Sequence, residues 1–413
     1  LWGIDFFWIA AIGLVVLTAL YTIFGGMKSV LYTSVLQTPI LLLGSLIILV
    51  LGFKELGGWD EMMRVCGAVT VNDYGDTMTN LIRSNDDANF PWLGALIGSA
   101  IIGFWYWCTD QFIVQRVLSG KNEMEARRGT IFGAYLKLLP VFLFLIPGMI
   151  AFALHQKYIG AGGEGFLPML ANGTANADAA FPTLVAKLLP AGVKGLVVCG
   201  ILAALMSSLA SLFNSSAMLF TIDFYKRFRP ETPEKKLVGI GQVATVVIVI
   251  LGILWIPIMR SVGDVLYTYL QDVQSVLAPG IAAAFLLGIC WKRTSAQGGM
   301  WGLIAGMVIG LTRLGAKVYY SNAGEVADST FKYLFYDMNW LFFCGWMFLF
   351  CIIVVIVVSL ATKAPTAEKI QGLVFGTATK EQKAATRASW NHWDIIHTVI
   401  ILAITGAFYW YFW

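Results

Sequence analysis

Charged residues are scarce in this chain: of its 413 residues only 13% are Asp, Glu, Lys or Arg, whereas 58% are hydrophobic. Its mean hydropathy is +0.75. A chain of this composition cannot bury its apolar surface in one soluble core, which excludes a soluble enzyme and predicts a multi-pass protein of a lipid bilayer. The net charge of +4 is too small to indicate a nucleic-acid partner.

Histidine and cysteine are also few, with three and six residues. No Cys-x-x-Cys pair is present and no histidine lies at metal-ligand spacing from a cysteine, so the pattern predicts neither a zinc site nor a disulfide framework. We expect the cysteines to be small buried hydrophobic residues. The histidines His155, His392 and His397 lie at the ends of apolar runs without a nucleophile beside them, so we expect neither a cofactor nor catalysis.

Long apolar runs, by contrast, recur along nearly the whole chain. A run of about 20 residues crosses the roughly 30 Å of hydrocarbon in a bilayer as a helix. The runs predict an all-α polytopic fold of about ten transmembrane helices, at 4–24, 33–53, 92–112, 129–154, 193–225, 237–258, 264–291, 297–315, 339–362 and 393–413. No repeat or soluble segment interrupts them, so residues 1–413 are predicted to form a single transmembrane domain. The chain opens on an apolar run without Met, and we expect its first helices to be missing.

The charges between the runs predict an orientation. Lys and Arg gather in the loops after the third, fifth, seventh and ninth runs, which places those loops on the cytoplasmic side. The loops 54–91 and 156–192 are richer in Asp, Asn and Gly and should face outward, as should the C-terminus. Asn172-Gly173-Thr174 in an outer loop fits the N-glycosylation pattern, which a chance match explains equally well.

A stripe of small residues marks the fifth run. Ala204, Ser207, Ser208 and Ser211 are spaced so that they share one helical face. Close packing of small residues between helices is one explanation. The other is a sodium site, because hydroxyl and carbonyl oxygens can replace the water shell of a hard cation without a full charge.

Polar or helix-breaking residues also occur inside the fourth and seventh runs. Lys137 precedes Pro140, and it either extends to the interface or donates to a polar solute. Gln271 and Asp272 precede Pro279. An unsatisfied polar group costs several kcal/mol in hydrocarbon, so this segment must face protein or water. A broken helix that lines a solute path is the favoured interpretation.

Three aromatic residues at the end of the third run, Trp105, Tyr106 and Trp107, precede Asp110. They fit an interfacial aromatic belt. They fit equally a platform that stacks on the apolar face of a sugar ring.

These segments resemble three motifs of the sodium/solute symporter family, and within it the sodium/glucose cotransporters. The motifs are Trp105-Tyr106-Trp107-Cys108-Thr109-Asp110-Gln111, Ala203-Ala204-Leu205-Met206-Ser207-Ser208-Leu209-Ala210-Ser211, and Pro279-Gly280-Ile281 continuing to Trp291-Lys292-Arg293. The resemblance runs from about residue 20 to the end of the chain. It implies a LeuT-like core of two inverted repeats that lacks its first helices. Residues 1–53 then end the first repeat, 92–291 form the second repeat, and 297–413 form peripheral helices.

The resemblance also implies a set of site residues. The sodium ligands fall on Ala204, through its carbonyl oxygen, and on the hydroxyls of Ser207 and Ser208. The sugar contacts fall on Tyr106, Trp107, Lys137 and Gln271. The same Tyr106 matches the tyrosine that closes the cytoplasmic side of the sugar, and Tyr267 matches an outer-gate aromatic residue.

Two positions depart from the family pattern. Gly103 stands where a polar sugar contact is expected, which bears on hexose preference. Ser34 stands where relatives commonly have Asp, which bears on a second sodium site, on proton coupling or on stoichiometry.

The resemblance therefore implies sodium-coupled symport of a glucose- or galactose-like monosaccharide by alternating access at the plasma membrane, with sodium as the coupling ion. The alternatives are the same machinery with inositol or a monocarboxylate as solute, and a non-transporting sugar sensor. The sequence gives no indication of oligomeric state.

Overall fold

The computed structural model describes residues 6–170, 173–260, 266–323 and 327–412, so Asn172 of the glycosylation pattern lies outside the described residues. The described residues are almost all helical, and pairing between extended segments is limited to isolated bridges such as Thr70 with Thr77. Ten helical segments within them are long and apolar enough to cross a membrane. The prediction of an all-α protein with about ten spans is confirmed.

The chain divides into two compact units, each made of two separate stretches. Unit 1 comprises Leu1–Ala68 and Leu136–Gly263, and unit 2 comprises Val69–Tyr135 and Asp264–Trp413. The chain passes between the units three times, and one of these boundaries falls inside the helix α5 (Glu123–Pro140). The prediction of a single domain with the boundaries 1–53, 92–291 and 297–413 stays a prediction.

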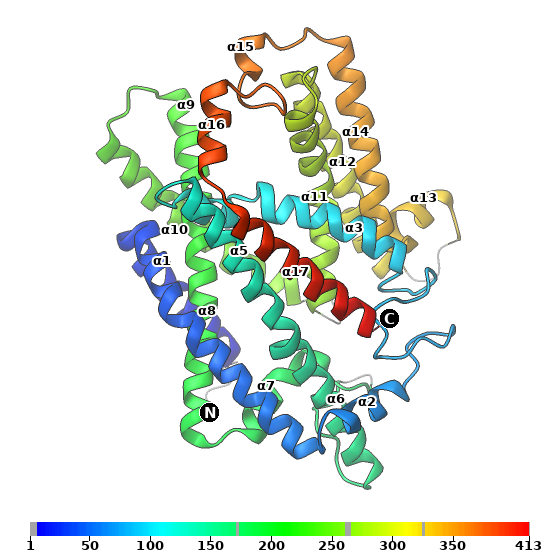
Figure 1. Cartoon of the computed structure of the whole chain (residues 1–413). Helices are drawn as coiled ribbons and strands as arrows, with labels where there is room; N and C mark the ends of the chain where they lie inside the picture. The colour runs from blue at the N-terminus through cyan, green and yellow to red at the C-terminus, as the bar shows by residue number, and fades with distance from the viewer. Residues whose placement is uncertain (1–5, 171–172, 261–265, 324–326, 413) are drawn as a thin grey trace. The chain divides into compact units, whose positions relative to one another are not determined.

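Unit 1 contains most of the helices from the first half of the chain. They are α1 (Phe6–Leu56), α2 (Trp59–Gly67), α6 (Ile146–Gly160), α7 (Ala180–Leu188), α8 (Ala191–Met218), α9 (Lys226–Phe228) and α10 (Glu234–Arg260), with the π-helical turns η2 (Val141–Leu145) and η4 (Leu219–Tyr225) and the 3-10 turn η3 (Ala177–Ala179). The helix α1 runs along α8 (Figure 1). Their backbones approach where Gly200 faces Ile40 and Leu41, since a Cβ on Gly200 would lie 3.5 Å from the Leu41 backbone nitrogen.

The first two predicted spans, 4–24 and 33–53, lie on one continuous helix of 51 residues. Both stretches are apolar and long enough to cross a membrane, and the structure adds that one helix carries them both. The link 25–32 contains glycine, lysine and serine but no proline, and the one proline inside α1 is Pro39. Glycine costs a helix only about 1 kcal/mol relative to alanine, so the backbone hydrogen bonds continue where the apolar run stops. The helix ends at Gly57 and Gly58, whose φ angles of 113° and 109° favour glycine.

The fourth predicted span changes helix type directly after its proline. The helix α5 ends at Pro140, a π-helical turn covers Val141–Leu145, and α6 continues from Ile146. Proline removes one backbone donor and widens the local turn, which accounts for the change in helix type.

Unit 2 contains the first part of α5, up to Tyr135, and the remaining helices. They are α3 (Trp92–Phe104), α4 (Gln111–Leu118), α11 (Leu266–Cys290), α12 (Ala296–Asn322), α13 (Thr330–Lys332), α14 (Trp340–Ala361), α15 (Ala367–Ile370), α16 (Lys380–Ala388) and α17 (His392–Tyr411), with the π-helical turns η1 (Trp105–Thr109) and η5 (Tyr333–Asp337). The helices α11, α12 and α14 pack side by side (Figure 1). One core of the unit brings Ile101 and Ile102 of α3 against Ala278 and Ala282 of α11 and Cys344 of α14.

The interpretation of all six cysteines as buried is only half right. Cys66, Cys344 and Cys351 are buried, whereas Cys108, Cys199 and Cys290 are exposed. The exposed residues lie within or at the end of segments apolar enough to cross a membrane, where exposed surface faces lipid or other protein. Burial raises the pKa of the Cys66 thiol to about 11, which keeps it in the unreactive thiol form.

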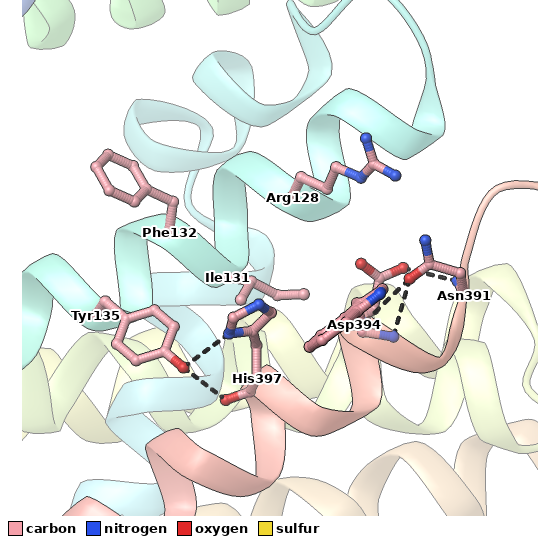
Figure 2. A pocket seen from close by; sticks show the side chains of 8 residues that line it. Arg128, Ile131, Phe132, Tyr135, Asn391, Asp394 and His397 are labelled. Atoms are coloured by element: carbon pink, nitrogen blue, oxygen red, sulfur yellow. Dashed lines mark hydrogen bonds between the residues drawn. The ribbon is translucent and has the colours of Figure 1, made fainter.

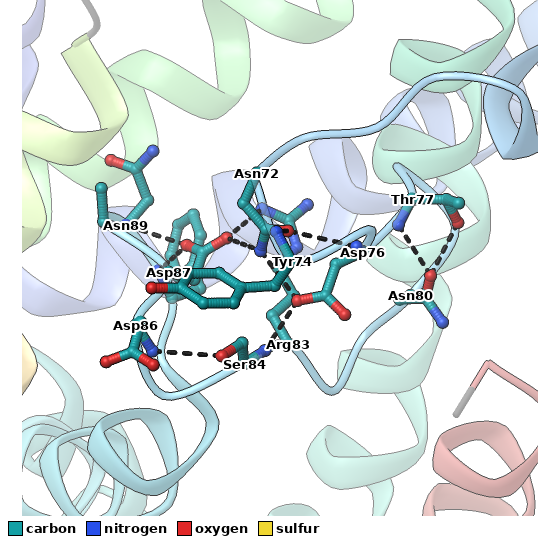
Figure 3. Close-up of polar contacts among 12 residues, drawn as sticks. Asn72, Tyr74, Asp76, Thr77, Asn80, Arg83, Ser84, Asp86, Asp87 and Asn89 are labelled. Carbon is teal, nitrogen blue, oxygen red and sulfur yellow. Dashed lines mark hydrogen bonds and ion pairs between the residues drawn. The ribbon is translucent and has the colours of Figure 1, made fainter.

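The loop between α2 and α3 is tied together by its own polar side chains (Figure 3). The Asn72 side chain donates to Asp76 Oδ2 at 2.7 Å and to Asp87 Oδ2 at 3.2 Å. Asp87 also accepts from the backbone N–H groups of Asn89 and Phe90. Burial by itself raises the pKa of Asp87, but these hydrogen bonds and the charge of Arg83 outweigh it and leave the pKa below its ordinary value.

Candidate functional site

The predicted sodium stripe lies on α8, and its residues differ in exposure. Ser207 and Ser211 are buried, Ala204 is intermediate, and Ser208 is exposed. The helix begins after Pro190 and runs without a break to Met218, so these residues keep the 3.6-residue spacing that the sequence predicted. Ser207 and Ser211 therefore pack inside unit 1, whereas the Ser208 side chain lies on the exposed surface of α8.

Ser34 of α1 is the direct partner of Ser207. Their hydroxyl oxygens lie 2.5 Å apart and share a hydrogen bond in which either can be the donor. The residue at which this sequence departs from the family pattern therefore touches a predicted sodium ligand. A hydroxyl here offers an uncharged oxygen to a cation, where a carboxylate would offer a charged one.

A second polar bond joins the same two helices. The Tyr21 hydroxyl of α1 donates to the Met206 carbonyl oxygen of α8 at 2.8 Å. Tyr21 belongs to none of the sequence motifs, although a tyrosine inside an apolar run at membrane depth is a signal that it has a polar partner. Together Tyr21 and Ser34 fix the face of α1 that α8 meets.

Lys137 belongs to unit 1 and lies on α5, three residues before Pro140, with an exposed side chain. The other predicted sugar contacts, Tyr106, Trp107 and Gln271, belong to unit 2.

Tyr106 and Trp107 lie in η1, the π-helical turn between α3 and α4. Their ring centroids are 5.2 Å apart with an interplanar angle of 88°. Trp107 is 49% exposed, and Tyr106 is half-buried. The side chain of Asp110 accepts from the Phe112 N–H and caps α4. The motif thus places an exposed Trp107 beside a half-buried Tyr106 at a point where the helix widens, and such π-helical turns are frequent at functional sites.

Gln271 and Tyr267 lie one turn apart on α11. The Gln271 side chain donates from Nε2 to the Tyr267 hydroxyl at 2.9 Å, and Tyr267 is 56% exposed. The predicted outer-gate residue and the predicted sugar contact are therefore hydrogen-bonded to each other. Arg313 and Lys317 of α12, which are not among the predicted site residues, contact the neighbouring Asp272.

The interpretation of this segment as a broken helix is wrong. The helix α11 continues from Leu266 to Cys290 with Pro279 inside it. The next residue, Gly280, lies against Gly306 of α12, since a Cβ on Gly280 would be 3.2 Å from the Gly306 Cα. Neighbouring helices can compensate for the backbone bond that proline removes, and here close packing holds the helix in shape.

A cavity of about 390 Å³ lies between α5 and α17 in unit 2 (Figure 2). Arg128 and Tyr135 of α5 and Asp394 and His397 of α17 are among the residues that line it. The Tyr135 hydroxyl lies 3.0 Å from His397 Nδ1. None of the predicted site residues lines this cavity.

Comparison with protein families and curated proteins gives consistent matches. Residues 2–306 match the model of the sodium:solute symporter family. The chain is 35% identical over 427 residues to the sodium/mannose cotransporter of Bos taurus, covering 98% of this chain and 72% of the relative. It is 38% identical over 377 residues to sodium/glucose cotransporter 1 of Ovis aries, covering 87% and 57%. It is 35% identical over 381 residues to sodium/myo-inositol cotransporter 2 of Homo sapiens, covering 90% and 56%.

The chain therefore spans a little more than half the length of several of these relatives. Among solved structures, the substrate-bound outward-open state of a Na+-coupled sialic acid symporter matches with a TM-score of 0.65. The identity is 20%, over 88% of this chain and 68% of that one. At this identity the likeness concerns the fold alone, and it confirms the predicted fold class.

Proposed function

Because the chain belongs to the sodium:solute symporter family, we propose that the protein couples the movement of a monosaccharide across the plasma membrane to the movement of sodium. Membership of this family confirms the resemblance seen in the motifs and the prediction of a transporter rather than an enzyme. The observation that carries the proposal is the match over residues 2–306. Relatives named as mannose, glucose and myo-inositol cotransporters narrow the solute class to sugars and polyols.

In this proposal sodium binds at α8 through the Ala204 carbonyl and the hydroxyls of Ser207 and Ser208. Ser207 is buried and its hydroxyl is hydrogen-bonded to Ser34 of α1. An ion bound at Ser207 therefore interacts with both α8 and α1. The ion has to bind one conformation of the protein more tightly than the other, since only a difference in affinity shifts the equilibrium between states.

The sugar binds in the proposal to Tyr106, Trp107, Lys137 and Gln271. The exposed Trp107 ring and the half-buried Tyr106 ring beside it suit the apolar face of a sugar ring, and the Gln271 amide suits its hydroxyls. Tyr106 and Tyr267 act as the inner and outer gates. The hydrogen bond from Gln271 to Tyr267 supports this assignment, because solute binding at Gln271 then competes with a contact to the gate.

A polyol such as myo-inositol is the second candidate solute, and the 35% identity to the human sodium/myo-inositol cotransporter 2 favours it. Monocarboxylate transport and a non-transporting sugar sensor remain as further alternatives. A sensor predicts sugar-evoked current without accumulation of the sugar.

Uptake into proteoliposomes that contain the purified protein tests the proposal. Labelled glucose, galactose, mannose and myo-inositol are each offered with an inward sodium gradient, and with potassium in its place as control. We expect accumulation of at least one of them only with sodium. Uptake that is indifferent to sodium, or absent for all four, contradicts sodium-coupled sugar or polyol symport.

A further inference from the structure

Three charged residues meet between α11 and α12 in unit 2. Asp272 lies on the first turns of α11, and Arg313 and Lys317 lie four residues apart on α12, so the two cations share a face. Arg313 Nη2 is 3.5 Å from Asp272 Oδ1, and Lys317 Nζ donates to Asp272 Oδ2. All three belong to segments apolar enough to cross a membrane, where an ionised side chain calls for a specific reason.

The cluster depends on its single acid. The side chains of Arg313 and Asp272 are only 1% and 13% exposed. Within the described part of the chain, Asp272 is the one carboxylate at ion-pair distance from either cation. Arg313 has three further contacts: hydrogen bonds to the carbonyl oxygens of Met338 at 2.8 Å and Leu334 at 3.5 Å, and the ring of Phe343, whose centroid is 4.1 Å from Cζ. If the carboxylate is lost, Arg313 therefore keeps its other contacts, whereas Lys317 loses its ion pair.

The cluster continues a close contact between the two helices. A Cβ on Gly306 would lie 2.9 Å from the Gly280 Cα, and a Cβ on Gly310 would lie 2.5 Å from the Val276 carbonyl oxygen. Residues 280, 276 and 272 follow each other at one-turn spacing on α11, opposite 306, 310 and 313 on α12. The glycine contacts set the distance between the helices, and the ion cluster adds a charged contact at the end of the same row.

Gln271 is adjacent to Asp272 and therefore points about 100° away from it around the helix axis. The face of α11 that bears Val276 is buried, whereas Gln271 is directed to Tyr267 on a more open face. Any rotation of the first turns of α11 moves both side chains together. The contact of Asp272 with α12 consequently determines where the Gln271 amide lies.

We propose that Asp272 is a positioning residue for solute binding: by pairing with Arg313 and Lys317 it fixes the rotation of α11 that presents Gln271 and Tyr267. This inference rests on the proposed function, in which Gln271 is a solute contact. It assigns to Asp272 no contact with the solute or with sodium.

Uptake kinetics of the full chain in proteoliposomes test the proposal with four variants: Asp272→Asn, Asp272→Glu, Lys317→Met, and Asp272→Asn with Lys317→Met. We expect Asp272→Asn to raise the KM for the solute about tenfold or more, since small misplacements of a binding group have effects of this size. The sodium concentration for half-maximal uptake should change less than about twofold. Asp272→Glu keeps the charge and should retain most of the affinity.

The double variant separates charge balance from mere loss of a side chain. In Asp272→Asn, Lys317 has lost its ion pair, and the Lys317→Met change removes that unpaired cation. The KM of the double variant should therefore be about threefold or more lower than the KM of Asp272→Asn alone. Asp328→Asn is the matched control, because Asp328 is 94% exposed and pairs with Lys332 at the surface. An additive double variant, or a folded Asp272→Asn protein with the parent's KM, overturns the proposal.

Hydrogen exchange of the segment 267–277 provides a readout that does not depend on transport. We expect faster exchange in Asp272→Asn than in the parent and the double variant. If the parent takes up no solute but exchange follows this pattern, the proposed function fails while the role of Asp272 in fixing α11 stands. If the parent takes up solute and exchange is unchanged in Asp272→Asn, the positioning role fails alone.

Discussion

The hydroxyl oxygens of Ser34 and Ser207 lie 2.5 Å apart and join α1 to α8 by a hydrogen bond. Ser34 is the position at which the family pattern commonly has Asp, and Ser207 is a predicted sodium ligand. Whatever charge residue 34 carries therefore acts directly on the oxygen atoms around Ser207.

Replacing Ser34 with Asp should strengthen sodium binding. A carboxylate adjacent to Ser207 adds a negative charge within a few ångströms of the proposed ion, and we expect half-maximal uptake at a sodium concentration lower by roughly tenfold. Sodium titration of solute uptake measures this shift. Ser34→Asn is the control, because asparagine has nearly the same shape as aspartate but carries no charge. An equal shift in both variants, or none in Ser34→Asp, contradicts a sodium site at Ser207.

Replacing Ser208 with Ala should weaken sodium binding without abolishing the fold. The lost hydroxyl contact to a charged partner is worth about 1.5–3 kcal/mol, which corresponds to a rise of about tenfold or more in the sodium concentration for half-maximal uptake. Ser216→Ala, on the same helix but outside the stripe, is the control and should leave the titration in place. Unimpaired uptake at low sodium in Ser208→Ala would count against Ser208 as a ligand.

Replacing Gly310 with Ala should destabilise unit 2. The added methyl group would lie 2.5 Å from the Val276 carbonyl oxygen, and overpacking of this kind costs about 1–3 kcal/mol. Thermal unfolding of the purified protein in detergent should show a lower midpoint. Gly315→Ala on the same helix meets nothing within 4 Å, so its midpoint should be equal or higher. Equal midpoints for the two variants would show that α11 and α12 do not pack as described.

The loop between α2 and α3 should open in acid. The pKa of Asp87 is below its ordinary value of 3.8 in the folded protein. Its ionised form therefore stabilises the loop fully above pH 3.8, and this contribution is lost as the pH falls through the lower folded pKa. Pepsin cleavage within 69–91 should therefore rise as the pH falls below 3.8 and through the folded pKa of Asp87.

Asp87→Asn removes the same charge at any pH and should make the loop sensitive to pepsin already at pH values well above that interval. Asp73→Asn, a change at an exposed carboxylate of the same loop, is the control. Cleavage that is independent of the residue at position 87 would show that the polar contacts of Asp87 do not hold the loop.

Hydropathy predicted the ten spans because the length and apolarity of a crossing segment are local properties of the sequence. It did not predict that the first two spans share one helix. Lys28 and Ser29 interrupt the apolar run, but a helix backbone does not require apolar side chains, and only proline would have forced a break. In the same way Pro279 indicated a break in α11 that the close approach of Gly306 makes unnecessary.

The site residues were predicted from motifs, and their surroundings required the structure. The sequence singled out Ser34 and Ser207, which are 173 residues apart, but gave no indication that they touch. Arg313 and Lys317 were not predicted as functional residues, because they lie near the end of a predicted span, where a cation commonly extends to the interface. The π-helical turn at Tyr106 is also invisible in the sequence, since its residues differ little in type from those of the helix before it.

The glycine contacts of α12 also limit how the protein can move. Gly306 meets the backbone of α11, while Gly298 meets the backbone of α14, where a Cβ would lie 2.9 Å from the Val355 carbonyl oxygen. Helices whose main chains touch have no layer of flexible side chains along which to slide. The trio α11, α12 and α14 is therefore expected to travel as one rigid body, and solute passage must use hinges elsewhere, such as the π-helical turns that interrupt other long helices.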